Sequence, residues 1–277
     1  MLKNLLVHLP SERPMRPVVD GAISLASSHG AHLDAISVGY EITNVALAVD
    51  GGAAIAAVYD LERDRALERA KAALAVFESE ARNAGIAYSC RPLTANPAEA
   101  AATLAATARV YDLTVVLQPE PGPDSYDQVV TQEILFQSGG PLLFIPYTHK
   151  GTLEAKHIGI AWDGSRVAAR ALRDAAPFLG RAQAVTIINL NNEQTPAQAS
   201  TAALVAHLAR NGLTARTEHM NADRADVQPA ILSITADAGI DLIVMGGYGH
   251  SRLQELILGG VTRGMIQSMT VPTLMSH

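Results

Sequence analysis

Short apolar runs alternate along this chain with segments whose apolar residues recur at helical spacing. After Asp241, residues 242–245 form a continuous apolar run, as expected of a strand that is covered on both faces. In the segment before it, Ala202, Val205 and Leu208 follow a helical period. Alternating strands and helices predict an α/β fold in which right-handed crossovers connect a parallel sheet.

The alternating pattern occurs twice in the same order. The matching segments are 3–9 with 156–162, 112–116 with 241–245, and 136–143 with 266–274. The intervals between these segments are similar in the two copies. A repeat that keeps its order and spacing predicts two homologous domains, which we place at residues 1–150 and 151–277.

Two further features bear on the boundaries of the elements. Thr195-Pro196 has the form of a helix start, with an N-cap followed by proline, and Asn211-Gly212 has the form of a helix end. The first copy also carries an extra stretch at residues 42–60 that is rich in Ala, Val and Gly. The sequence leaves open whether this stretch is a lid, a partner surface or a long loop.

Composition restricts the classes of partner and compartment. Only 17% of the 277 residues are charged, with 21 basic against 27 acidic side chains and a net charge of −6. Because there is no Lys/Arg cluster, we expect neither nucleic acid nor an anionic membrane surface as a partner. No apolar run reaches the roughly 18 residues of a membrane span, and the run near Met1 is too short for a signal peptide. We therefore expect a soluble, cytoplasmic protein.

Cysteine and histidine content argue against two kinds of site. The single cysteine, Cys90, excludes a disulfide framework and a multi-cysteine metal site, and we expect its thiol to be inert. Nine histidines are scattered without i, i+4 pairs, and no Ser-His-Asp or Cys-His arrangement can be placed. We therefore expect no metal site and no catalytic nucleophile.

Glycines gather after the last long apolar run. Six of the 21 glycines lie between Gly246 and Gly264, directly after a predicted strand and around the start of a predicted helix. Glycines in such a turn let backbone N–H groups approach a ligand, and the helix start that follows favours a phosphate. Neither a Walker A nor a GxGxxG spacing is present, which disfavours a P-loop or a dinucleotide site. The alternative is a glycine-rich turn that only permits tight packing.

The spacing of these glycines resembles the ATP-binding signature of the universal stress protein family, G-x-x-G, nine residues, then G-[S/T]. Gly246, Gly249 and Gly259 match it with the nine-residue gap intact. The resemblance extends over both halves of the chain and implies a tandem member of the family. It implies two Rossmann-like (adenine nucleotide alpha hydrolase-like) domains, each a five-stranded parallel sheet of order 3-2-1-4-5 flanked by helices.

The resemblance also implies a set of nucleotide-binding residues in the second copy. Asp163, at the end of the first strand, would contact the adenosine moiety, Ala161 takes the place of a proline that some members carry, and Leu190 would back the adenine. The phosphate-binding residues would be Gly246, Gly249, His250, Gly259, Gly260, Val261 and Thr262. The implied strand order places Asp163 and Gly246 at one switch point, where ligands of open α/β sheets bind.

Two departures from the family pattern change what is expected. Gly260 replaces the Ser/Thr of the signature, so a hydroxyl donor worth about 0.5–1.5 kcal/mol is lost. Thr262 either supplies a hydroxyl in its place or caps the helix, and the sequence leaves both open. In the first copy, Pro10 stands in the place of Asp163 and Glu120 stands within the stretch that replaces the glycine loop. We therefore expect a degenerate first domain that serves as a structural partner.

These features predict a protein that binds ATP, or AMP or ADP, with or without Mg²⁺, and acts as a nucleotide-dependent regulator or sensor in a stress response. We expect the two copies to form an intrachain pseudo-dimer through their fifth strands, with a homodimer left open. The alternatives are a slow ATPase or phosphotransfer enzyme that uses His250 or Arg252, and a nucleotide-free scaffold. No acidic pair suited to Mg²⁺ lies beside the loop, which disfavours efficient hydrolysis. Trp162 lies either near the base or buried beside the switch point.

Overall fold

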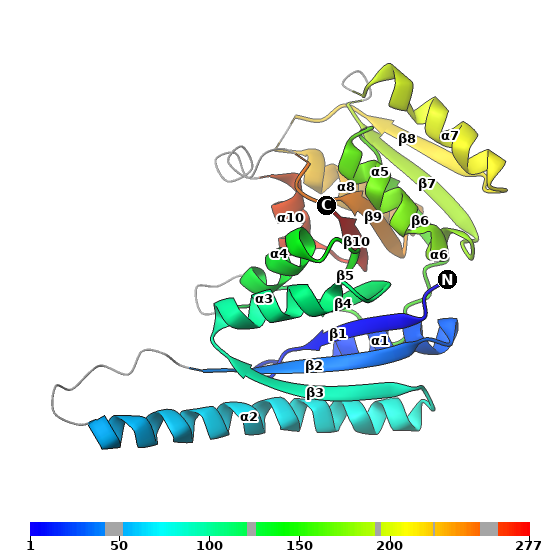
Figure 1. Ribbon diagram of the computed structural model, residues 1–277. Helices are drawn as coiled ribbons and strands as arrows, with labels where there is room; N and C mark the ends of the chain where they lie inside the picture. The colour runs from blue at the N-terminus through cyan, green and yellow to red at the C-terminus, as the bar shows by residue number, and fades with distance from the viewer. Residues whose placement is uncertain (42–51, 121–125, 192–194, 224, 250–259) are drawn as a thin grey trace. The chain divides into compact units, whose positions relative to one another are not determined.

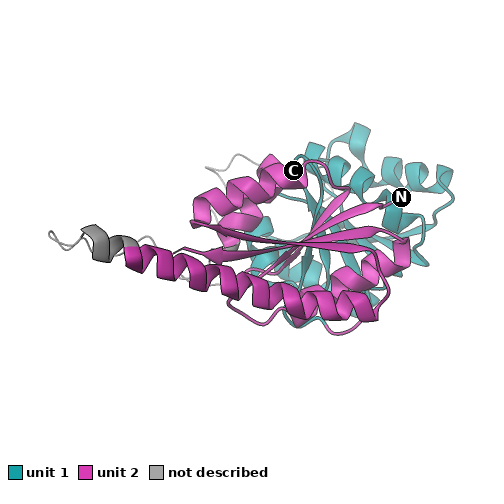
Figure 2. Cartoon of the chain, turned by 60° about the horizontal axis from the view of Figure 1, so that its bottom comes forward, with its two compact units in different colours: residues 1, 139–149, 153–277 teal, residues 2–138, 150–152 magenta. Residues whose placement is uncertain are grey.

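The computed structural model describes residues 1–41, 52–120, 126–191, 195–223, 225–249 and 260–277 (Figure 1). These residues divide into two compact units (Figure 2). Unit 1 comprises residue 1 with residues 139–149 and 153–277, and unit 2 comprises residues 2–138 and 150–152. Each unit is an α/β fold built on mostly parallel strands, as the alternating pattern predicts.

Unit 2 contains four parallel strands in the order β3-β2-β1-β4. Its elements are β1 (Asn4–Leu9), α1 (Arg16–His29), β2 (His32–Tyr40), α2 (Gly52–Asn83), β3 (Tyr88–Ala95), α3 (Pro97–Ala108), β4 (Leu113–Leu117) and α4 (Asp127–Gln137). This order is the 3-2-1-4 part of the predicted arrangement. Helix α1 packs beside α2, and α3 packs beside α4.

Unit 1 contains six strands in the order β5-β10-β9-β6-β7-β8. Its elements are β5 (Leu142–Ile145), β6 (His157–Ala161), α5 (Arg166–Asp174), α6 (Ala176–Leu179), β7 (Ala184–Leu190), η2 (Ala197–Ala199), α7 (Thr201–Arg210), β8 (Ala215–Met220), α8 (Val227–Ala238), β9 (Leu242–Gly246), α10 (Val261–Ser268) and β10 (Thr273–Ser276). The five strands β6 to β10 run parallel in the predicted order 3-2-1-4-5. Strand β5 is antiparallel to β10.

The repeated aspartate has the same structural role in both units. The Asp112 carboxylate accepts the backbone N–H groups of Lys3 and Asn4 at 2.7 and 2.8 Å, beside the start of β1. The Asp241 carboxylate accepts the corresponding N–H groups before and within β6, both at 2.9 Å. Asp112 thereby ties the start of β4 to the start of β1, and Asp241 ties the start of β9 to the start of β6. The aspartate that recurs in the sequence thus aligns the same pair of strands in both units.

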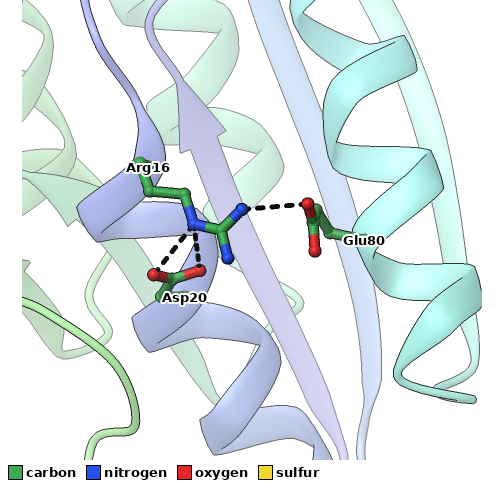
Figure 3. A network of polar contacts seen from close by, with 3 residues as sticks. All are labelled: Arg16, Asp20 and Glu80. Carbon is green, nitrogen blue, oxygen red and sulfur yellow. Dashed lines mark hydrogen bonds and ion pairs between the residues drawn. The ribbon is translucent and has the colours of Figure 1, made fainter.

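Helix α2 packs on β2 at a position that requires glycine. A Cβ built on Gly39 would lie 1.9 Å from the Ala66 carbonyl oxygen, so only glycine lets the helix come this close. Farther along α2, exposed Arg16 of α1 donates to Asp20 and Glu80 (Figure 3). Such exposed ion pairs contribute little to stability, so the close packing at Gly39 does more to place α2.

Two expected boundaries differ from the structure. The predicted helix start at Thr195-Pro196 is wrong, because Ala197–Ala199 form only a short 3-10 turn and α7 begins at Thr201. Ser200 has extended backbone angles and caps α7 by accepting the Ala203 N–H, which ends the turn before the helix starts. The predicted end at Asn211-Gly212 is confirmed, with Gly212 in the left-handed region at φ +77°.

The extra stretch at residues 42–60 is partly helical. Residues 42–51 lie outside the described residues, and residues 52–60 belong to the 32-residue helix α2. The long-loop interpretation is therefore wrong for the second part of the stretch.

No helix within the described parts of the chain is long and apolar enough to cross a membrane.

Candidate functional site

The strand order of unit 1 creates a switch point between β6 and β9. These two strands are neighbours and run parallel, and the chain continues from β6 to β7 on one side and from β9 to β10 on the other. Ala161 ends β6 and Gly246 ends β9, so both lie at the carboxyl edge of the strands. Ligands of open α/β sheets bind beyond this edge.

A cavity of about 1230 Å³ opens at this switch point. Its walls come from the ends of strands β6, β7 and β9 and from the first turns of helices α5, α8 and α10. The predicted site residues that line it are Ala161, Asp163, Leu190, Gly246, Gly249, Gly260, Val261 and Thr262. The other two predicted residues, His250 and Gly259, lie outside the described residues, as does Arg252.

The β6–α5 turn holds Asp163 at the cavity. Its carboxylate accepts the Ser165 N–H at 2.9 Å, and Gly164 between them is in the left-handed region at φ +72°. The Ser165 hydroxyl in turn accepts the Ala168 N–H at 3.2 Å and caps α5. Asp163 itself is exposed to solvent. The turn therefore presents a solvated carboxylate from a fixed backbone position.

Gly246 and Gly249 meet different surroundings. A Cβ on Gly246 would lie 2.5 Å from Val167 Cγ2 and 2.6 Å from the Ala168 nitrogen, so this glycine lets α5 start directly against the end of β9. A Cβ on Gly249 would lie 3.1 Å from Val167 Cγ2 and 3.9 Å from Ser165 Oγ. Tight packing thus accounts for Gly246, whereas an added Cβ on Gly249, which lines the cavity, would meet only side-chain atoms.

Thr262 holds the glycine loop. Its hydroxyl oxygen accepts the Tyr248 N–H at 3.0 Å, and only 4% of Thr262 is exposed. Tyr248 has φ +52°, a left-handed conformation that costs a non-glycine residue about 1–2 kcal/mol. The hydrogen bond fixes this unfavourable backbone, so Thr262 organises the loop. Thr262 also lines the cavity, and a hydroxyl that accepts one hydrogen bond still has a hydrogen that it can donate.

The first turn of α10 also faces the cavity. Gly260 is its N-cap, with extended backbone angles and no side-chain hydrogen bond to the helix. Val261 and Thr262 begin the helix and line the cavity. The N–H groups of a helix start carry partial positive charge and favour an anion. The loss of the signature hydroxyl at Gly260 therefore leaves the backbone donors of α10 in place.

One wall of the cavity was not predicted. It is formed by the segment after β8 and by the start of α8, through Met220, Ala222, Asp223, Asp226 and Val227. Asn191, after β7, supports this wall by donating to the Ala222 carbonyl at 2.9 Å and accepting the Ala222 N–H at 3.0 Å. The implied strand order contained a signal for it, since the third strand also ends at the carboxyl edge.

Trp162 is a buried indole beside the switch point. It is 7% exposed, and its ring N–H donates to the Ala199 carbonyl at 2.8 Å. Its own carbonyl accepts the Asn189 side-chain amide at 2.7 Å. These contacts attach the β6–α5 turn to the segment before α7. The residue also lines the cavity, so a packing role and nearness to a ligand are compatible.

An arginine occupies the corresponding place in unit 2. Arg13, which follows β1, donates to the Gln118 carbonyl after β4 at 2.9 Å and lies 3.9 Å from the Glu120 carboxylate. The Arg13 side chain is only 11% exposed. In unit 2 the strand ends at the switch point are therefore linked by the chain's own cation. At the switch point of unit 1, by contrast, the ends of β6 and β9 line a cavity.

Polar groups elsewhere form no recognisable catalytic arrangement among the described residues. In unit 2, Ser89 Oγ and Asp34 Oδ1 lie 2.9 and 3.3 Å from the same ring nitrogen of His32, whereas a catalytic triad uses both nitrogens. The pKa of Cys90 is raised to about 11, mainly by desolvation and further by the carboxylates of Glu78 and Asp34. This thiol stays protonated at neutral pH, which agrees with the inert thiol expected. Within the described ranges no group of three or more His, Cys, Asp or Glu residues could hold a metal ion.

Comparison with known proteins gives a family match in the second half of the chain, two short sequence matches and a likeness of the whole fold. The model of the "Universal stress protein family" matches residues 154–277. A universal stress protein of Methanocaldococcus jannaschii is 41% identical over 44 residues, which are 16% of this chain and 27% of that protein. One from Synechocystis is 36% identical over 47 residues, 17% of this chain and 16% of that protein. The matched segments thus span about a quarter or less of these relatives.

A solved structure shares the architecture over nearly the whole length. The crystal structure of a universal stress protein from Archaeoglobus fulgidus has a TM-score of 0.73 at 17% sequence identity. The match covers 98% of this chain and 95% of that one. At this identity the likeness establishes the fold alone.

Proposed function

We propose that this chain, whose residues 154–277 match the model of the universal stress protein family, binds ATP or a closely related adenine nucleotide in its second half and acts as a nucleotide-dependent regulator of a cytoplasmic stress response. One observation carries the proposal. Gly246, Gly249, Asp163 and the start of α10 all line one cavity at the switch point of unit 1. The two halves, residues 1–150 and 151–277, are proposed to be its homologous domains.

The residues of the cavity fit the two ends of a nucleotide. Gly249, Gly260 and the first N–H groups of α10 offer donors to phosphates in a place with no bulky side chain. Asp163 offers a carboxylate that can accept hydrogen bonds from ribose hydroxyls, and apolar Leu190 offers a surface for the base. Mg²⁺ would be brought by the phosphates. Mass spectrometry of nucleotide released from the purified, denatured protein distinguishes ATP, ADP and AMP.

The substitution Gly249→Val tests the phosphate site. A Val side chain would project from the loop into the space that the phosphates need, so ATP affinity should fall at least tenfold, about 1.4 kcal/mol. The atoms within 4 Å of its Cβ are a side-chain methyl and a side-chain hydroxyl rather than backbone, so the fold should persist. Titration calorimetry measures the affinity, with Gly180→Val as the matched control at an exposed glycine away from the cavity. Unchanged ATP affinity in a folded Gly249→Val protein would show that the phosphates do not bind beside Gly249.

We expect one nucleotide per chain. In unit 2, Arg13 already bridges towards Gln118 and Glu120, and Glu120 would repel phosphate. Calorimetric titration of the full chain should therefore give a stoichiometry of one, and Gly249→Val should lose that single site. A stoichiometry of two, with the second ligand mapped to the Gln118 region, is the result that contradicts this expectation.

The proposed internal pseudo-dimer draws its support from one strand pair. β5 comes from the first half of the sequence and is antiparallel to β10, with Leu143 opposite Leu274. An antiparallel pair of fifth strands is what a two-fold relation between the halves requires. The ATPase alternative depends on His250 and Arg252, which lie outside the described residues, so we propose no second function.

A further inference from the structure

The last residue of β10, Ser276, and the residue after it, His277, both lie beside Gly247. β10 pairs with β9 so that Ser276 stands opposite Gly246, and the next residue after each strand continues alongside. The Gly247 N–H donates to the Ser276 carbonyl at 2.9 Å. His277 Nδ1 lies 3.1 Å from the Gly247 carbonyl oxygen. Both backbone polar groups of Gly247 are therefore engaged by two successive residues.

The contact with His277 defines which atom must carry a hydrogen. A carbonyl oxygen only accepts, so Nδ1 donates to Gly247, either as the neutral Nδ1–H tautomer or as the imidazolium. Nδ1 is attached to Cγ and is therefore three bonds away from Cα. A replacement side chain can keep this hydrogen bond only if its donor atom is also three bonds from Cα.

Gly247 precedes the strained residue of the loop. Tyr248 is held at φ +52° and its N–H is bound by Thr262, and Gly249 after it lines the cavity. A non-glycine residue keeps such a conformation only when the surrounding structure over-determines it. The Gly247 carbonyl and the Tyr248 N–H belong to one peptide group. Thr262 accepts its N–H and His277 Nδ1 contacts its oxygen, so both polar groups of the peptide that precedes Tyr248 are held.

We propose that His277 is a positioning residue of the glycine loop and that, through Gly247, it raises the affinity for phosphate-bearing nucleotides. The proposal rests on the nucleotide-binding function proposed above. His277 acts on the loop and so on the phosphates. Adenosine, which lacks phosphates, should bind without its help.

The test compares ATP and adenosine binding to the full chain and its variants by titration calorimetry. His277→Ala removes the donor and should weaken ATP binding about fivefold while leaving adenosine binding unchanged. His277→Asn places an amide N–H at the position of Nδ1 and should restore ATP affinity to within about twofold. His277→Gln places its amide one bond farther and should behave like alanine. His207→Ala, at an exposed position on α7, is the matched control and should change neither affinity.

The outcomes separate this proposal from the proposed function. If the unmodified chain binds no ATP, both the proposed function and the positioning role of His277 are wrong. If the unmodified chain binds ATP and His277→Ala binds it equally well, only the positioning role fails. A parallel loss of ATP and adenosine affinity, or a failure of His277→Asn to restore ATP binding, also overturns it, because a general loss of structure would then explain the result.

Discussion

Gly246→Ala is expected to lower the free energy of unfolding by about 2–3 kcal/mol and to remove nucleotide binding at the same time. The added methyl carbon would lie 2.6 Å from the backbone nitrogen of Ala168 and 2.7 Å from the carbonyl carbon of Val167. Backbone atoms cannot rotate away, so α5 must move off the end of β9. That movement displaces the β6–α5 turn, which carries Asp163.

Urea unfolding and ATP titration measure the two effects of Gly246→Ala. Gly249→Ala is the matched comparison, because its added carbon meets only side-chain atoms, the nearest at 3.1 Å. It should leave the unfolding free energy within about 0.5 kcal/mol of the unmodified value. If Gly246→Ala unfolds at the same urea concentration as the unmodified chain, the close approach of α5 and β9 is not a feature of the folded protein.

The two glycines also show what the sequence could and could not predict. The spacing of Gly246 and Gly249 predicted a phosphate loop after a buried strand, and the structure puts both residues at one cavity. The sequence did not separate packing from ligand approach, since both need the absence of a Cβ. That distinction depends on where α5 starts in space, and it appears only when the distances to Val167 are known.

The strands were predictable from the sequence because continuous apolar runs mark them, whereas the strand order came from the family resemblance. Asp112 and Asp241 recur in the sequence repeat, but their contacts with the start of β1 and β6 are seen only in the structure. By contrast, the α8 wall of the cavity depends on Asn191, whose left-handed φ of +59° lets it reach the Ala222 backbone. Such a contact joins residues 31 positions apart and leaves no periodic signal.

The first half of the chain shows the same limit. Pro10 and Glu120 in the sequence predicted the loss of a phosphate site in unit 2. They did not predict that Arg13 would connect the ends of β1 and β4. One arginine among 21 basic residues carries no distinguishing pattern, and its partner Gln118 is engaged through a backbone carbonyl. Backbone acceptors are present at every residue, so the sequence cannot single one out.

Leu143→Lys is expected to lower the free energy of unfolding by about 3–5 kcal/mol and to cause aggregation. Leu143 lies in the middle of β5, is fully buried, and stands opposite Leu274 of β10, which is also fully buried. The lysine loses the apolar contacts of leucine and brings a charge without a counterion into this pair. If β5 separates from β10, the unpaired N–H and C=O groups of β10 become an open edge that other chains can join.

Urea unfolding and light scattering of the full chain measure the effect of Leu143→Lys. Val110→Lys is the matched control, because it makes an apolar-to-lysine change at a residue that is 79% exposed, and it should leave both measurements unchanged. A Leu143→Lys protein that stays monodisperse and unfolds at the unmodified urea concentration would show that β5 does not cover β10 in solution. Loss of solubility in Leu143→Lys alone would instead support pairing of the two fifth strands, the contact on which the proposed relation between the two halves depends.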